Sequence, residues 1–170
     1  MNVSYYLVRL IHQAEAIARL VDGMGEDVAR WRPAPDAWSI LEVINHLYDE
    51  EIEDFRLRLQ LTLRDPNEPW PPNDPVRKVT ARNYNERDLG ASVENFLDER
   101  TVSLEWLRGL EQPQWENAHV MPSGSTLTAG DLLVSWVAHD LLHLRQLIEI
   151  HFAYQNQLAQ PYSVDYAGDW

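Results

Sequence analysis

The sequence has no cysteine, which excludes disulfides and thiolate metal sites, so any bound metal must be held by His, Asp or Glu. No apolar run approaches the roughly 20 residues of a membrane span, and the first residues lack the basic and apolar regions of a signal peptide. Lysine and arginine are scarce, 14 against 27 Asp and Glu, and the net charge of −13 argues against nucleic-acid binding, which needs a basic surface. These absences predict a cytoplasmic protein that binds neither membranes nor nucleic acids.

Four segments show the apolar periodicity of amphipathic helices, and 170 residues are enough for one well-filled core. The first segment ends at two glycines typical of helix C-termini, Gly23 and Gly25. The second opens with a capping-box pattern formed by Ser39 and Glu42. We therefore predict a single all-α domain, residues 1–170, with helices over about 4–22, 37–63, 89–110 and 127–155.

Two long connectors without helical periodicity separate these helices. The first, about Asp65–Arg87, contains D-P-N-E-P-W-P-P-N-D-P, whose five prolines predict a stiff, extended segment with no helix. A connector of more than ~20 residues can cross a whole bundle, so the second and third helices are expected to run parallel. The second connector, Trp115–Thr126, is expected to be irregular, and its His119 is interpreted as a loop histidine. The aromatic-rich C-terminal tail, 158–170, is expected to pack on the body.

The fourth helix carries His139 and His143, which are four residues apart and so lie one above the other on the same face. That face is otherwise apolar, and burying an imidazole without a partner costs roughly 1 to 3 kcal/mol. The spacing is that of helix-borne zinc motifs, so metal binding is the favoured interpretation. The opposite face is also apolar, which predicts a dimer interface or cover by the tail. It is formed by Val134, Val137, Leu141, Leu144, Ile148 and Phe152.

Three kinds of metal site use two histidines on a helix. A zincin has H-E-x-x-H, but here Asp140 replaces the glutamate, projects off the histidine face and is followed by no third ligand. A di-iron bundle has paired E-x-x-H motifs, whereas the only one here is Glu116–His119 in a connector. The third kind is a mononuclear site completed by His46, which lies on the flank of the apolar face of its helix. Three neutral imidazoles leave positions open for water or substrate, as in catalytic zinc sites.

The segments W-S-I-L-E-V-I-N-H-L and H-D-L-L-H-L-R-Q, in this order, resemble the DinB/YfiT-like family of proposed metalloenzymes, and the similarity runs from the first helix to the fourth. The resemblance implies an up-down-down-up four-helix bundle. It also implies a three-histidine metal site, carried here by His46, His139 and His143. Members of the family are frequently dimeric, so the resemblance implies a homodimer as well.

The resemblance further implies a metal-dependent enzyme acting on a small molecule, either a thiol S-transferase that activates a low-molecular-weight thiol or a hydrolase. Zinc and nickel are the expected metals and iron is compatible, because imidazole suits all three. Asp49 and Glu50, one turn after His46, are candidates for a general base or a further ligand, although acidic runs such as D-E-E-I-E-D usually mark a solvated face. No basic pocket is evident for the carboxylates of a thiol, so the substrate class stays open.

Two other hypotheses are compatible with the sequence. One is a non-catalytic, stress-related binding or interaction protein that keeps the bundle and the metal. The other is a purely structural dimer whose core histidines are satisfied by hydrogen bonds. Metal bound to the purified protein would separate the enzyme hypothesis from the structural one, because a site with catalytic-zinc ligands retains its ion.

Overall fold

The computed structural model describes residues 1–168, and nearly all of its elements are helical. In chain order they are α1 (Val3–Val21), α2 (Glu26–Arg30), α3 (Ile40–Glu50), the π-helical turn η1 (Glu51–Phe55), α4 (Arg56–Arg64), α5 (Pro75–Ala81), the 3₁₀ turn η2 (Tyr84–Glu86), α6 (Leu89–Arg108), β1 (Ala118–Val120), β2 (Thr126–Thr128), α7 (Ala129–Ala159) and the 3₁₀ turn η3 (Asp165–Ala167). Within this part of the chain, none of the helices combines the length and the hydropathy that a membrane span requires.

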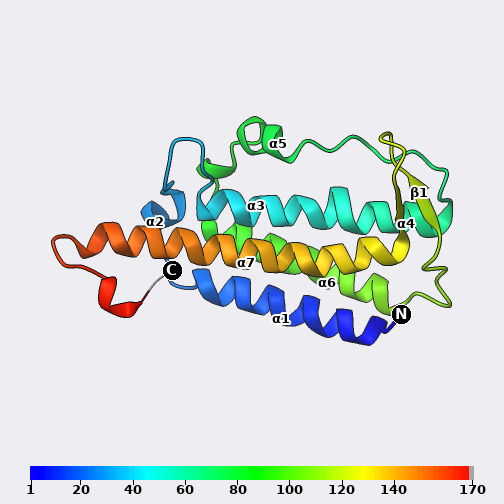
Figure 1. The fold of residues 1–170 in the computed structure, drawn as a ribbon, viewed down its shortest axis with the longest axis horizontal. Coiled ribbons are helices and arrows are strands. Elements are labelled where there is room, and N and C mark those ends of the chain that lie inside the picture. The colour runs from blue at the N-terminus through cyan, green and yellow to red at the C-terminus, as the bar shows by residue number, and fades with distance from the viewer. Residues whose placement is uncertain (169–170) are drawn as a thin grey trace.

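The bundle is built from four long segments: α1, the rod formed by α3, η1 and α4, then α6 and α7 (Figure 1). α1 and α7 run one way along the long axis, and the rod and α6 run the other way. The chain between α4 and α6 passes back along the bundle, which lets the rod and α6 run parallel. The predicted fold class, an all-α up-down-down-up bundle, is confirmed.

The connector between α4 and α6 contains a helix, contrary to the prediction. α5 begins at Pro75, and the Asp74 side chain caps it by accepting a hydrogen bond of 3.0 Å from the Arg77 N–H. Proline is well tolerated at the first helical position, where its missing N–H has no helical partner, so Pro75 starts a helix rather than breaking one. The second connector also differs from the prediction, because it contains the antiparallel hairpin β1–β2.

The start of α3 follows the predicted capping box. The Ser39 hydroxyl accepts a hydrogen bond of 3.1 Å from the Glu42 N–H, and the Glu42 carboxylate accepts one of 2.8 Å from the Ser39 N–H. The Arg32 guanidinium also donates two hydrogen bonds to the same carboxylate, one to each oxygen. These contacts satisfy N–H groups that would otherwise be unpaired at the helix start, and they fix where the helix carrying His46 begins.

A buried arginine on α6 joins all four segments. Arg100 is 2% exposed and pairs with Glu51 at 2.6 Å and with Asp140 at 2.7 Å. Its guanidinium also donates to the Leu10 carbonyl of α1 at 2.9 Å. Five hydrogen bonds to these three residues match the five N–H donors of a guanidinium, so the charge is fully satisfied although it is buried.

The π-helical turn η1 decides which acid faces the core. Glu51 is 1% exposed, whereas Ile52, which a regular apolar stripe would bury, is only partly buried. The extra residue in a π turn shifts the helical register, and such turns are frequent at functional sites. Glu51 therefore reaches Arg100 and accepts a bond of 2.9 Å from the indole N–H of Trp136.

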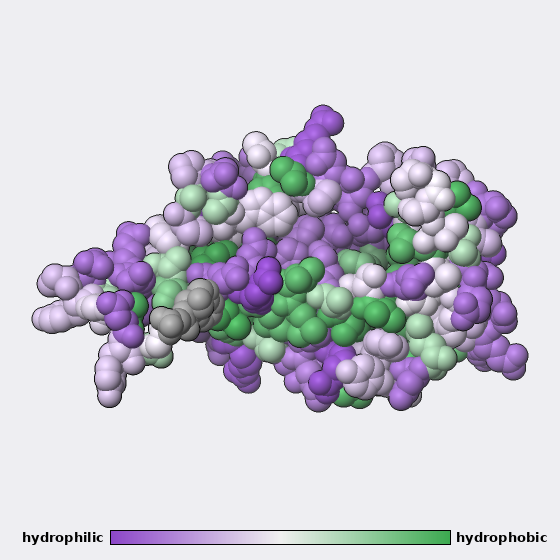
Figure 2. All heavy atoms as spheres, viewed as in Figure 1, coloured by the Kyte–Doolittle hydropathy of each residue, from purple (hydrophilic) through white to green (hydrophobic). Residues whose placement is uncertain are grey.

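α7 leaves part of its second apolar face exposed. Val134, Leu141 and Ile148 follow one another at intervals of seven residues and are 42%, 55% and 42% exposed. In Figure 2 an apolar band follows α7 on the face toward the viewer. The seven-residue spacing keeps these side chains on one stripe, as in helices that pair through heptads.

The C-terminal tail does not cover this stripe, and the prediction that it packs on the body is wrong for the residues described. α7 continues to Ala159 and projects past the end of α1, so it carries the tail beyond the bundle (Figure 1). Tyr162 is 78% exposed and Tyr166 is fully exposed. The last two residues covered by that prediction, Asp169 and Trp170, lie outside the described residues.

We expect Arg100→Met to lower the free energy of unfolding by about 3 to 5 kcal/mol, because it leaves Glu51 and Asp140 buried without a counter-charge. Urea denaturation followed by circular dichroism measures this. The control is the triple variant Glu51→Gln, Arg100→Met, Asp140→Leu, which keeps an acceptor for the Trp136 indole. It should regain most of the loss, and equal destabilisation of both variants would contradict the ion-pair explanation.

Candidate metal centre

Three histidines from two helices meet with their ring nitrogens together. His46 comes from α3, and His139 and His143 come from α7. Nε2 of His139 lies 3.4 Å from Nε2 of His46 and 3.0 Å from Nε2 of His143, and the ligating atoms of all three lie within 4.8 Å of one another. Two nitrogens bound at about 2.0 to 2.1 Å by a tetrahedral zinc would be about 3.3 Å apart. The spacing therefore suits three ligands of one ion.

His46 is more deeply placed than the sequence predicted. It was expected on the flank of its helix, but it is 4% exposed. The reason is that α3 is covered on several sides, by α6, α7, α5 and η2. The crossover, which was expected to be extended, thus forms one of the walls that bury this histidine.

Groups around the cluster set the direction of each imidazole. Nδ1 of His143 donates to the amide oxygen of Gln146 at 2.8 Å, which leaves a lone pair on Nε2, facing the other histidines. Nδ1 of His46 lies 3.7 Å from Oε1 of Glu50. Such outer contacts orient metal-binding histidines in known metal sites. Nδ1 of His139 has no hydrogen-bond partner among residues 1–168.

Burial keeps the three imidazoles neutral. Burial first, and then the neighbouring histidines, lower the pKa of His46 to about 2 and that of His139 to about 3. Burial also lowers the pKa of His143. Neutral imidazole is the form that binds metal, because its free ring nitrogen carries a lone pair. The three neutral imidazoles turn their Nε2 atoms toward one another, so they fit a divalent metal.

The two candidate acids have different surroundings, and both are buried rather than solvated. Asp49, 2% exposed, accepts hydrogen bonds from Arg82 and Tyr84, so its carboxylate is engaged away from the histidines. Glu50 is 5% exposed and faces His46. Burial raises the pKa of Glu50 to about 8, and the negative charge of Asp54 acts in the same direction. Of the two acids, Glu50 is the one whose carboxyl reaches the cluster.

Aromatic rings enclose the cluster. The ring of Trp38 lies 5.0 Å from that of His46, and the ring of Phe55 lies 5.0 Å from that of His139. Nothing in its local sequence pattern separates Trp38 from the other tryptophans of the chain. It follows Pro33 and Pro35, however, and a proline-stiffened loop entering the helix of a candidate ligand was a usable signal.

His119 does not join the cluster. It lies in β1, is 8% exposed, and stacks on Trp70 with ring centroids 4.2 Å apart. Its Nδ1 donates to the carbonyl of Pro66 at 2.9 Å. The residue interpreted as a loop histidine is thus a buried contact that attaches the crossover to the hairpin.

A cavity of about 620 Å³ opens beside the cluster. His143 and Gln146 of α7 line it, together with Trp38 from the segment that leads into α3. The volume falls within the usual range for small-molecule sites. A small molecule in this cavity would contact a candidate metal ligand directly.

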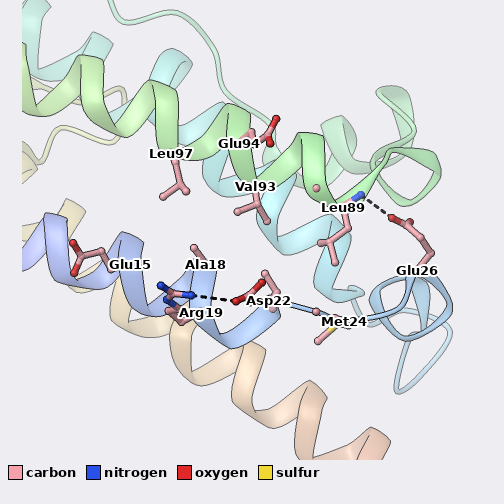
Figure 3. A pocket seen from close by; sticks show the side chains of 13 residues that line it. Glu15, Ala18, Arg19, Asp22, Met24, Glu26, Leu89, Val93, Glu94 and Leu97 are labelled. Carbon is pink, nitrogen blue, oxygen red and sulfur yellow. Dashed lines mark hydrogen bonds and ion pairs between the residues drawn. The ribbon is translucent and has the colours of Figure 1, made fainter.

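A second cavity, of about 520 Å³, lies between α1, α2 and α6 and contains none of the three histidines (Figure 3). Its wall is largely apolar, with Ala18, Val93 and Leu97 among the lining side chains. The Glu26 carboxylate is engaged with the Leu89 N–H at 3.0 Å. The candidate metal ligands lie at the other cavity, which His143 lines, so that cavity is the candidate site.

Comparison with known proteins agrees with this fold. Residues 9–147 match the model of the DinB superfamily. A search of curated proteins finds no match. Among solved structures, YfiT from Bacillus subtilis superposes with a TM-score of 0.77 over 87% of this chain and 85% of YfiT, at 17% sequence identity. YfiT is described as a probable metal-dependent hydrolase with an unusual four-helix bundle topology.

Similarity to YfiT at this level of identity shows a shared fold. The family match is a separate observation, and it covers the rod with His46 and the part of α7 that holds His139 and His143. Because it extends over most of the 170 residues, the chain belongs to the DinB superfamily.

Proposed function

We propose that this protein is a metal-dependent hydrolase of small molecules, with one divalent metal held by His46, His139 and His143. The observation that carries the proposal is that the Nε2 atoms of three neutral imidazoles converge beside a cavity of about 620 Å³. Nε2 of His139 lies 3.4 Å from that of His46 and 3.0 Å from that of His143. YfiT, which shares the fold, is described as a probable metal-dependent hydrolase. Zinc or nickel suits three imidazoles best, and iron is compatible.

The residues around the cluster have separate tasks in this proposal. When bound, the divalent metal supplies Lewis-acid chemistry, lowering the pKa of a water and polarising a carbonyl. Gln146 holds His143 in the tautomer that presents Nε2 to the centre. Glu50 lies beside His46, where its carboxylate can take up the proton that water releases.

Hydrolysis is favoured over thiol transfer by the lining of the cavity. A low-molecular-weight thiol with several carboxylates needs basic side chains to hold it. Of the described residues that line the cavity, none is a lysine or an arginine. Thiol S-transfer is therefore the second outcome that an activity screen should test, and metal binding without turnover would favour a non-catalytic binding protein.

We also propose a homodimer formed through the exposed stripe Val134, Leu141 and Ile148. Large apolar side chains exposed in a row on one helix mark an interaction surface. The stripe can pack against the same stripe of a second copy related by a two-fold axis. Its heptad spacing lets the two α7 helices pack along their length.

We expect about one zinc ion per chain in the loaded protein and loss of high-affinity binding in His139→Ala, measured by competition with a chromogenic chelator. Gln146→Ala should weaken zinc binding about 10- to 100-fold, because it removes the contact that orients His143. His12→Ala is the matched control, since it removes an exposed histidine from α1. Unchanged affinity in His139→Ala would overturn the assigned ligand set.

The zinc-loaded protein should hydrolyse 4-nitrophenyl acetate faster than the metal-free protein. Glu50→Gln should keep its zinc and lose about 10²- to 10⁴-fold in kcat, the usual contribution of a general base. A parallel screen pairs low-molecular-weight thiols with 1-chloro-2,4-dinitrobenzene. Turnover only in the thiol screen would replace hydrolysis by S-transfer, and zinc binding without turnover in either screen would contradict the enzyme proposal.

For the dimer, sedimentation velocity should show two chains per particle for the wild type and one for Leu141→Glu, because a buried charge opposes pairing of the stripes. Val102→Glu is a control with the same charge change at an exposed apolar position on α6. A wild-type monomer at micromolar concentration, or a dimer in Leu141→Glu, contradicts this interface.

A further inference from the structure

We propose that the cavity beside His143 selects substrates that carry an organic cation, such as a quaternary ammonium group, attached to the acyl part of a hydrolysable ester or amide. The inference rests on the proposed hydrolytic function and names its substrate class. Three features of the cavity carry it: an aromatic wall, two acidic side chains and the lack of basic ones.

The aromatic feature is Trp38. Its ring lies 5.0 Å from that of His46, and its side chain lines the same cavity as His143. The electron-rich face of an indole attracts cations, and a quaternary ammonium beside an aromatic ring is a recurrent way of binding such ligands. A ligand held against Trp38 is therefore close to two of the three candidate metal ligands.

The acidic feature consists of Asp36 and Glu149. Asp36 comes just before Trp38 in the loop wall, is exposed, and has no hydrogen bond or ion pair with other residues among 1–168. Glu149 lies on the α7 wall, and its partner Arg145, 3.3 Å away, is itself outside the lining. The Arg145 side chain is 70% exposed and that of Glu149 is 46% exposed, so the ion pair between them is weak. The Glu149 carboxylate can therefore interact with a cationic ligand. The two acids thus line the same cavity, Asp36 from the loop before α3 and Glu149 from α7.

Basic groups near the histidines are engaged elsewhere. Lys78 lies close enough to His46 to lower its pKa, after burial and the other histidines, but the lysine pairs with Glu53 at 2.7 Å. It does not line the cavity. The whole chain carries a net charge of −13, which also attracts cations and repels anions at long range. An anionic substrate would therefore meet repulsion in the cavity with no compensating partner.

The remaining lining completes a slot for a flat or branched apolar body between the charged end and the reacting end. It consists of Pro33, Ala37, Ile150 and Ala153 with His143 and Gln146. In the reaction, water adds to the acyl carbon next to the cluster and the bond from that carbon to the leaving oxygen or nitrogen breaks. The leaving group takes the proton that Glu50 removed from water, and the cationic acid remains.

Three rigid esters that differ in one substituent test the inference: the 4-nitrophenyl esters of 4-(trimethylammonio)benzoate, 4-tert-butylbenzoate and terephthalate. The first two have nearly the same shape, so charge is the main difference. With each kcat/KM divided by the spontaneous hydrolysis rate of that ester, the zinc-loaded wild type should prefer the cationic ester over the anionic one by about 10-fold or more. The double variant Asp36→Lys, Glu149→Lys should reverse the order.

A control variant changes net charge equally at exposed acids outside the cavity: Asp27→Lys, Glu105→Lys. It should keep the wild-type order. A binding measurement adds a readout independent of turnover. Benzyltrimethylammonium should bind the wild type, as titrated by calorimetry, more tightly than benzoate does, and Asp36→Lys, Glu149→Lys should lose that preference.

The outcomes separate the two proposals. Hydrolysis of all three esters at similar relative rates, or tighter binding of benzoate, overturns the cation preference and leaves the hydrolase proposal intact. A cation preference that the control variant also loses would trace to net charge and would overturn the assignment to this cavity. Binding of benzyltrimethylammonium without zinc-dependent hydrolysis of any ester supports the cation site and overturns the hydrolase proposal.

Discussion

The orientation of the candidate site depends on the buried guanidinium of Arg100. It ties Leu10, Glu51 and Asp140 to α6, so one side chain sets the relative rotation of all four long segments. Glu51 and Asp140 directly follow Glu50 and His139 in the chain. Neighbouring residues on an α-helix point about 100° apart, so holding one member of each pair toward the arginine turns the other toward the cluster. The π turn at Glu51–Phe55 provides the register that this arrangement needs on the rod.

The histidine cluster and the Arg100 network differ in how their buried polar atoms are paired. Every donor of Arg100 has a partner, so that network can stabilise the bundle by itself. The three Nε2 atoms instead face one another, and Nδ1 of His139 has no partner among residues 1–168. Burial keeps His46 and His139 neutral, which is the form that can bind a metal ion. A cluster of neutral ring nitrogens that have only one another as partners is a mark of a metal site, because a bound ion stabilises the fold by its own binding energy.

The features read correctly from the sequence are those that local periodicity determines. Each long segment has an apolar stripe, and the spacing of His139 and His143 places them on one face whatever the tertiary structure. The place of His46 relative to that pair depends on how α3 packs against α7, so the sequence offered His46 as a third ligand and the family resemblance favoured that choice. Burial of His46, Asp49 and Glu50 was missed because it depends on a crossover helix that starts at a proline and on a π turn, neither of which leaves a periodic signal. The exposed tail was missed because the C-terminal end of α7 is polar and carries no periodic signal that marks where the helix ends.

The central claim is that the three histidines bind one metal ion, and anomalous diffraction from crystals of the zinc-loaded protein tests it most directly. The account predicts one strong peak per chain at the zinc edge, about 2.0 to 2.1 Å from Nε2 of His46, His139 and His143, with at least one coordination position facing the cavity lined by Trp38. Peaks only at surface carboxylates, or zinc bound by the α7 pair with His46 turned away, would contradict it.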